Sequence, residues 1–303
     1  MANNHLLTLY MFYLFLTIIC TSALFILFRV YSNLKIDIFQ SIVWNYVVCS
    51  ITGFIQQYSS LNKALYIQHM DTVVAASLLG SCFLPSFFLI GISTQRAGLT
   101  PTTMANKLSM VIPAGFALIA GLAPFAWLQI LAFLLGIASI YLVTQKKSTE
   151  VTSDILKSNY YLPWFVFLSA GLLDLGILYI NSTIASPESV GLFSIHTFTA
   201  AAFWGTLVLT FLLITKKTTF QSKAILSGIV LGIPNYFSVY YLLKTLNHYQ
   251  HDGSFVFPML NLCIILFTAL VSFLFFKEKF TIKLNIGLLL ASTAILLLYL
   301  IKI

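Results

Sequence analysis

The chain has 303 residues, of which 59% are apolar and only 8% are charged, and its formal net charge is +8. A soluble domain carries about 25% charged residues, so this chain has too few polar side chains to cover a soluble fold of its length. The composition therefore excludes a soluble enzyme, a nucleic-acid-binding module and a disordered protein. Because the apolar runs are continuous and do not alternate as in an outer-membrane barrel, we expect an all-α membrane protein.

Ten windows of the sequence have the length and apolarity of a spanning helix, which needs about 20 mainly apolar residues. In chain order, we expect transmembrane helices at 7–29, 38–58, 72–94, 99–121, 125–144, 161–181, 189–213, 224–243, 254–276 and 284–301. The first run follows no basic residue and is longer than the core of a signal peptide, so it is typical of a spanning helix. A GxxxG motif at Gly228 and Gly232 predicts close helix packing in the eighth span.

The two halves of the chain resemble each other. A shift of 155 residues superimposes the fourth expected span on the ninth, with Gly98 on Gly253 and Asn106 on Asn261. An odd number of spans per repeat inverts the second copy, and inverted repeats place a substrate site near the membrane midplane. We therefore expect a first five-helix repeat at 1–145, a linker at 146–160 and a second five-helix repeat at 161–303.

Basic residues are concentrated in the loops on one side of the expected bundle. That side holds twelve, namely Arg29, Lys35, Arg96, Lys146, Lys147, Lys157, Lys216, Lys217, Lys223, Lys277, Lys279 and Lys283, and the other side holds Lys63, Lys244 and Lys302. The positive-inside rule places the twelve in the cytoplasm and both termini outside. The same pattern predicts the lipid bilayer, and not nucleic acid, as the partner.

Two segments carry a resemblance to a known family. Residues 102–113, which include the adjacent Asn106 and Lys107, resemble the fourth span of EamA-type members of the drug/metabolite transporter superfamily. Residues 276–280 (Phe-Lys-Glu-Lys-Phe) resemble the family's segment after its ninth span. The resemblance implies a ten-helix secondary transporter with two inverted five-helix repeats. It also implies cytoplasmic termini, which is opposite to the orientation that the charge count favours.

Two ionisable residues are expected deep in the membrane. Lys107 lies about eight residues into the fourth span, where an ammonium costs at least about 2.5–3.5 kcal/mol on insertion scales. We expect it to bind a substrate carboxylate or phosphate, although a snorkelling or fixed structural lysine is the alternative. Asp174 lies near the middle of the sixth span and is the candidate for proton coupling, or for the counter-ion of Lys107. Its alternative is a protonated residue hydrogen-bonded to a neighbouring helix.

Asn106 and Asn261 occupy matching positions of the two repeats and are candidate substrate ligands, with interhelical hydrogen bonding as the equal alternative. His196 in the seventh span is a second proton-coupling candidate, although a hydrogen-bonded packing residue is the commoner role. Pro113 in the fourth span predicts a kink that helps this helix bow around a cavity.

Trp44 and Asn45 in the second span and Tyr240 in the eighth are candidates for lining the substrate cavity, although Trp and Tyr also anchor helices at membrane interfaces. His248, His251 and Asp252 have the side chains of metal ligands, but nothing nearby completes a coordination shell. We expect a polar connection there, with no metal and no cofactor.

The sequence has no P-loop, HExxH or GxSxG motif, so we expect a protein that is not an enzyme. The expected function is secondary transport, as exporter or exchanger, of a small polar, anionic or zwitterionic metabolite by alternating access. We expect a multi-pass monomer or homodimer in the cell (inner) membrane. One alternative is a membrane-embedded enzyme that acts on a lipid, which requires ionisable groups clustered at one membrane face. Another is a non-transporting assembly subunit, which would lack a central polar cavity.

Overall fold

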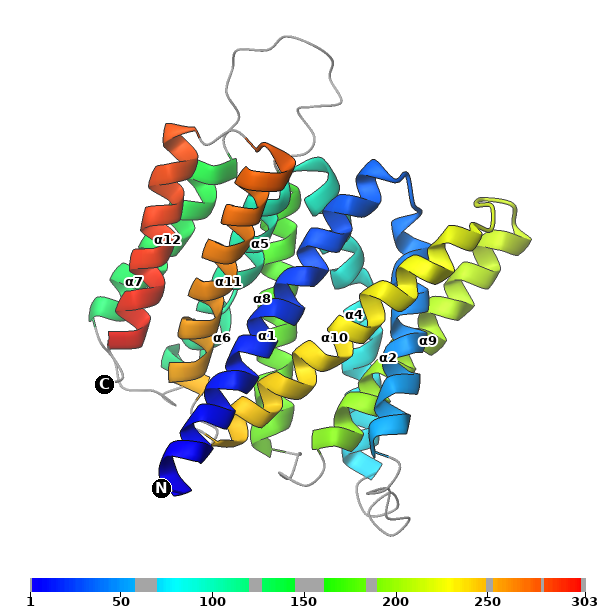
Figure 1. Cartoon of the computed structure of the whole chain (residues 1–303), viewed down its shortest axis with the longest axis horizontal. Coiled ribbons are helices and arrows are strands. Elements are labelled where there is room, and N and C mark those ends of the chain that lie inside the picture. The colour runs from blue at the N-terminus through cyan, green and yellow to red at the C-terminus, as the bar shows by residue number, and fades with distance from the viewer. Residues whose placement is uncertain are drawn as a thin grey trace. The chain divides into compact units, whose positions relative to one another are not determined.

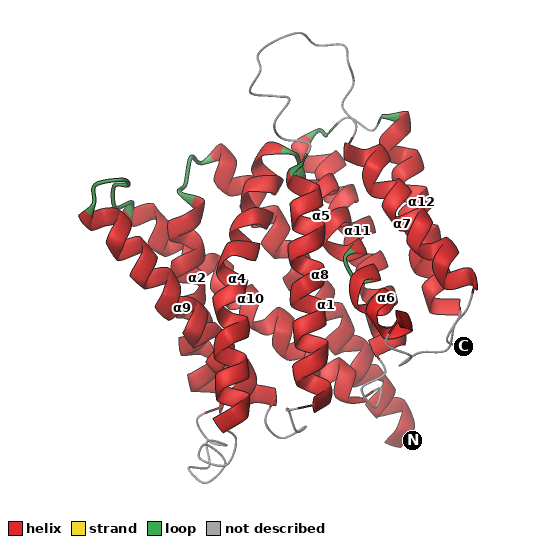
Figure 2. Cartoon of the chain, turned by 180° about the vertical axis from the view of Figure 1, so that it is seen from behind, coloured by secondary structure: helices red, strands yellow, loops and turns green. Residues whose placement is uncertain are grey.

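The computed structural model describes residues 2–57, 70–119, 127–144, 161–183, 190–248, 253–278 and 281–300. These ranges form helices and short loops (Figures 1 and 2). The helices are α1 (Ala2–Asn33), α2 (Ile38–Gln57), α4 (Met70–Arg96), α5 (Leu99–Leu108), α6 (Val111–Ile119), α7 (Trp127–Thr144), α8 (Leu162–Thr183), α9 (Val190–Ile214), α10 (Ser222–His248), α11 (Gly253–Phe276) and α12 (Ile282–Leu300). The predicted all-α class is therefore confirmed for the described part of the chain.

Five helices in the described ranges are long and apolar enough to cross a membrane, and they are α1, α2, α4, α9 and α10. Shorter apolar segments lie in α7, α8, α11 and α12. This pattern fits a membrane protein with several spans. The expectation of ten spans stays a prediction, because length and composition meet the criterion for five.

The fourth expected span, 99–121, is split into two helices. α5 ends at Leu108 and α6 begins at Val111, with a turn at Ser109 and Met110 between them. Pro113 in the first turn of α6 has no N–H to donate to the Ser109 carbonyl, and its ring would clash with that carbonyl in a continuous helix. The Ser109 carbonyl instead accepts from the Ile112 amide at 2.9 Å. The proline thus interrupts the helical hydrogen bonding for two residues, while Ser109 keeps right-handed helical backbone angles (φ −56°, ψ −20°).

Two further boundaries of the prediction lie outside the described residues. They are the break expected at 121–124 and the linker expected at 146–160. The division into two sequence repeats therefore stays a prediction.

The helices group by contact into two compact units. Unit 1 comprises Met1–Phe88 and Gly176–His248, and unit 2 comprises Leu89–Leu175 and Tyr249–Ile303. Each unit takes helices from both halves of the sequence, and α4 and α8 contribute residues to both.

In unit 1, α2 packs against α9 and α10, and α1 lies along α10. A Cβ atom at Gly228 would overlap the Cβ of Trp44, and a Cβ at Gly232 would lie 2.8 Å from the Asn45 carbonyl oxygen. The close packing predicted from the GxxxG motif is confirmed, because only glycine lets α10 approach the α2 backbone this closely. Gly80 permits a similar approach of α4 to α9, since its Cβ would lie 2.9 Å from that of Ala200.

In unit 2, α7 lies along α12 and α5 contacts α11. The Ser139 hydroxyl donates to the Gly287 carbonyl at 2.7 Å, and a Cβ at Gly287 would overlap Val143. The small residue at the start of the tenth expected span therefore lets α12 contact α7 directly.

The carboxylate of Glu278, which follows α11, closes the amino end of α5. The Leu99 amide donates to Glu278 Oε1 at 2.7 Å, and the Thr100 hydroxyl donates to Oε2 at 3.0 Å. These bonds satisfy donors that the first turn of a helix leaves without partners. Gly98 precedes the helix with φ 114°, a conformation that glycine adopts without a steric penalty. Glu278 therefore fixes where α5 begins.

Candidate functional site

Unit 2 brings together the two ionisable residues that were predicted to lie deep in the membrane. Lys107 is the penultimate residue of α5, and Asp174 lies in the middle of α8. The two side chains interact electrostatically. Their roles in substrate binding and proton coupling stay predictions.

The position of Lys107 follows from the helix break. The carboxyl end of a helix carries a partial negative charge from its unpaired carbonyls, and it stabilises a nearby cation. Lys107 occupies the last turn of α5, so the break places an ammonium at a favourable helix end within an apolar segment. The sequence located the lysine, but only the structure shows that a helix ends beside it.

Asp174 is accessible on the packed side of its helix. Leu168 and Leu172 mark the outward face of α8, where both are exposed. At 100° per residue, Asp174 is about 200° away from Leu172 and about 40° away from Ala170, which is buried. Asp174 is nevertheless exposed. Asp174 is therefore an exposed residue on the side of α8 that otherwise packs inward.

Ser109 is a member of this cluster that the sequence analysis did not identify. Its hydroxyl lies 3.2 Å from Asp174 Oδ2 and 2.5 Å from the carbonyl oxygen of Asn106. The residue is buried in the turn between α5 and α6. The sequence contained a signal for Ser109. It lies two residues after Lys107, and it is the residue whose carbonyl Pro113 cannot bond to, because a proline has no N–H for the carbonyl four residues earlier. Ser109 therefore connects the helix break to the carboxylate.

The two asparagines predicted as a matching pair both lie in unit 2, but in different environments. Asn261 is buried in α11, and its side-chain amide donates to the Lys107 carbonyl at 3.1 Å and contacts Met110 Sδ at 3.0 Å. Asn106 is half-buried in α5. The observed contacts of Asn261 are therefore those of a residue that holds the carboxyl end of α5. Direct substrate contact by either asparagine stays a prediction.

The other predicted site residues lie in unit 1. Asn45 is fully buried in α2, and its Oδ1 accepts from Asn235 Nδ2 of α10 at 3.1 Å. Two buried donors, Asn45 Nδ2 and Trp44 Nε1, have no hydrogen-bond partner among the residues that the structure describes. Such orphaned donors are costly in an apolar interior.

Tyr240 belongs to an aromatic cluster on α10. Its ring stacks on Tyr236 with centroids 6.2 Å apart, and Lys244 Nζ lies 5.6 Å from its centroid. Tyr236 in turn contacts Phe198 of α9. His196, two residues before Phe198 in α9, is half-buried. The structure thus places Trp44, Asn45, Tyr240 and His196 in one unit, and Lys107, Asp174, Asn106 and Asn261 in the other.

Metal binding has no support among the residues that the structure describes, where no group of three or more His, Cys, Asp or Glu side chains could hold an ion. His251 and Asp252, which the sequence analysis considered, lie outside the described ranges.

Comparisons with known proteins show a shared fold. No family model matches the sequence. An uncharacterized protein of Haemophilus influenzae is 24% identical over 293 residues, a match that covers 94% of this chain and 97% of that protein. A crystal structure superimposes with a TM-score of 0.61 at 14% identity and covers 97% of both chains. The helical arrangement is therefore one that an experimentally determined structure also adopts.

Proposed function

We propose that this protein is a secondary transporter of a small anionic or zwitterionic metabolite, and that Lys107 and Asp174 form its binding and coupling centre. The observation that carries this proposal is an accessible carboxylate that interacts with a lysine at a break in an apolar helix. Ionisable residues in such segments mark substrate or ion pathways. Broken helices whose ends face the substrate are a recurrent feature of secondary transporters.

The chemistry of the pair explains how binding and proton movement would be linked. While Asp174 is ionised, it is a counter-ion for the Lys107 ammonium. Protonation of Asp174 removes that counter-ion, and a substrate carboxylate or phosphate then takes its place on Lys107. The single hydroxyl proton of Ser109 goes either to the Asn106 carbonyl, at 2.5 Å, or to Asp174 Oδ2, at 3.2 Å. An ionised Asp174 competes for this proton more strongly than a protonated one. The turn between α5 and α6 therefore senses the charge state of Asp174.

Contacts within each unit support the proposed inverted repeats. The 155-residue shift pairs α2 with α9, α5 with α11 and α7 with α12, and each of these pairs is in contact. In an inverted repeat, a two-fold axis relates each helix of the first copy to its equivalent in the second. Two equivalent helices contact each other when both lie next to that axis.

A pair of residues gives a sharper indication of the same symmetry. Adding 155 to Gly80 gives Asn235, and subtracting 155 from Ala200 gives Asn45. The first pair makes a close contact between α4 and α9, and the second makes a hydrogen bond between α10 and α2. The contact between α4 and α9 and the contact between α10 and α2 are therefore equivalent under the sequence repeat, and both are close. This supports ten spans in two inverted repeats, the architecture that the resemblance to EamA-type drug/metabolite transporters implies.

The test is a thermal-shift screen of the purified protein against a library of small metabolites. A ligand that binds the folded state raises the melting temperature by mass action. We expect anionic or zwitterionic hits whose stabilisation disappears in Lys107→Ala and persists in Lys244→Ala, a variant of an exposed lysine in α10. Uptake of a hit into proteoliposomes then tests transport directly.

Two outcomes would reject the proposal. Hits that stabilise Lys107→Ala as much as the unmodified protein would remove Lys107 from the site. Hits that bind through Lys107 but are not moved across proteoliposomes, or are converted to product, would favour the assembly-subunit or enzyme alternative.

A further inference from the structure

Three lysines adopt a backbone conformation that normally requires glycine. Lys35, Lys216 and Lys277 have φ angles of 52°, 55° and 52°. This left-handed region costs an ordinary side chain roughly 1–2 kcal/mol per residue. They are the only non-glycine residues with positive φ in the part of the chain that the structure describes. Each lies one or two residues beyond the end of a helix, where glycine is usual.

The local hydrogen bonds show why these helices end where they do. In unit 1, the Ile36 amide bonds back to the Tyr31 carbonyl at 3.1 Å, and the Lys217 amide bonds back to the Leu212 carbonyl at 2.9 Å. This is the six-to-one bond of a Schellman motif, whose penultimate position takes the left-handed conformation. Glycine would satisfy the same geometry without strain. Lysine at both positions therefore carries a backbone cost that glycine would avoid.

The two strained lysines of unit 1 lie at the same end of that unit. The Gln221 side chain donates to the Lys35 carbonyl at 3.2 Å and accepts from the Asp37 amide at 2.6 Å. The Gln40 side chain donates to the Thr219 carbonyl at 2.8 Å and accepts from the Gln221 amide at 2.9 Å. These four bonds join the α1–α2 turn to the α9–α10 loop.

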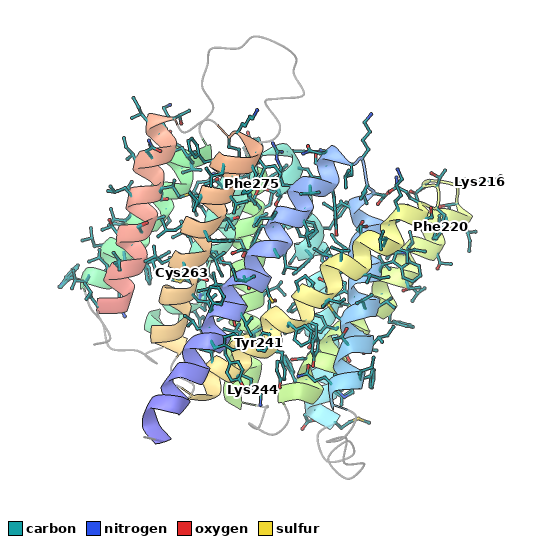
Figure 3. The ribbon with its side chains drawn as sticks, viewed as in Figure 1. Lys216, Phe220, Tyr241, Lys244, Cys263 and Phe275 are labelled. Carbon is teal, nitrogen blue, oxygen red and sulfur yellow. The ribbon has the colours of Figure 1, made fainter. Side chains whose placement is uncertain are left out.

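The surface formed by this junction is basic and partly apolar. We define the basic end as Lys35, Lys216, Lys217 and Lys223. The nearby carboxylate of Asp37 accepts from the Gln40 amide at 2.9 Å, so it caps α2. Ile214 and Phe220 flank the lysines and are 75% and 53% exposed. Figure 3 shows Lys216 and Phe220 at the loop that joins α9 to α10, far along α10 from Lys244.

We propose that the basic end is a binding site for the phosphate headgroup of an anionic phospholipid. Exposed apolar side chains beside lysines fit the boundary between acyl chains and headgroups. The Gln40–Gln221 bonds hold the lysines of two separate loops together, and the left-handed conformation fixes two of them at helix ends. Each lysine near an anionic membrane surface contributes about a fivefold preference for the charged lipid, equivalent to about 1 kcal/mol. This proposal does not depend on transport activity.

The experiment measures the melting temperature of the purified protein in phosphatidylcholine nanodiscs, with and without phosphatidylglycerol. We expect phosphatidylglycerol to stabilise the unmodified protein. Lys216→Gly relieves the backbone strain, so this variant should melt higher than the unmodified protein in phosphatidylcholine alone while gaining less from phosphatidylglycerol. A purely structural role for Lys216 predicts no change in the response to the anionic lipid.

Lys223→Ala and Lys244→Ala provide a matched pair, because both residues are exposed and lie on α10. They are separated by about 32 Å at 1.5 Å per residue. Native mass spectrometry of lipid retained from a mixture of the two phospholipids should show weaker retention of phosphatidylglycerol in Lys223→Ala, by about fivefold, and unchanged retention in Lys244→Ala. Equal effects of the two variants, or an undiminished phosphatidylglycerol response in Lys216→Gly, would overturn the proposal.

Discussion

The Asn261 side-chain amide donates to the backbone carbonyl of Lys107 at 3.1 Å. This carbonyl lies in the last turn of α5, and side chains are among the groups that bond to the carbonyls of a helix end. One side chain from α11 therefore holds the helix end that carries the candidate substrate-binding lysine. The contact links the conformation of the break to the position of α11.

We expect Asn261→Ala to lower the free energy of unfolding by about 0.5–1.5 kcal/mol, the usual net contribution of one hydrogen bond. Asn106→Ala is the matched control, because Asn106 occupies the corresponding position of the other repeat and is half-buried. Its substitution should cost less. Thermal unfolding in a neutral detergent measures both. Equal losses of unfolding free energy in the two variants would show that the hydrogen bond to the Lys107 carbonyl does not contribute measurably to stability.

The interaction between Lys107 and Asp174 can be measured with a double-mutant cycle. Lys107→Met and Asp174→Asn each leave one charged group without its counter-ion, whereas the double variant leaves neither. We therefore expect the two single losses of stability to exceed, in sum, the loss in the double variant, with a coupling of about 0.5–3 kcal/mol. Strictly additive melting shifts would mean that the two side chains act independently.

The role of Glu278 as a cap for α5 also gives a prediction. Glu278→Ala removes the acceptor for the Leu99 amide and the Thr100 hydroxyl, so we expect a loss of about 0.5–2 kcal/mol, as for other helix caps. Glu278→Gln keeps one side-chain oxygen and should lose less. Hydrogen exchange of the amides at the start of α5 reports the change locally. Unaltered exchange there in Glu278→Ala would contradict the assignment.

Two glycine-to-alanine substitutions should have effects of opposite sign. Gly228→Ala places a methyl group where it overlaps Trp44 and lies 3.0 Å from the Ser41 carbonyl oxygen, so α10 must move away from α2. Such overpacking costs about 1–3 kcal/mol. At Gly115 the nearest atom to a new Cβ is 3.8 Å away, so Gly115→Ala should stabilise α6 by about 0.5–1 kcal/mol. Melting temperatures that fall in both variants would refute the second estimate.

The sequence by itself determined the helical class and the positions of most helices. Composition was sufficient to predict helices because backbone N–H and C=O groups in an apolar setting must bond to each other. A helix satisfies them within one continuous apolar run. It also identified Lys107 and Asp174, since charges within apolar windows are rare and conspicuous. Gly228 and Gly232 predicted close packing because their spacing puts both on one helix face.

Only the tertiary structure decided how these residues are used. That Pro113 splits the span into α5 and α6, that Ser109 reaches Asp174, and that Asn261 holds the Lys107 carbonyl all depend on contacts between segments far apart in the chain. The left-handed lysines were equally invisible, because lysine has no preference for that conformation and the loops impose it. Periodicity reports which residues face inward, whereas the partner that each meets is set by how the helices cross.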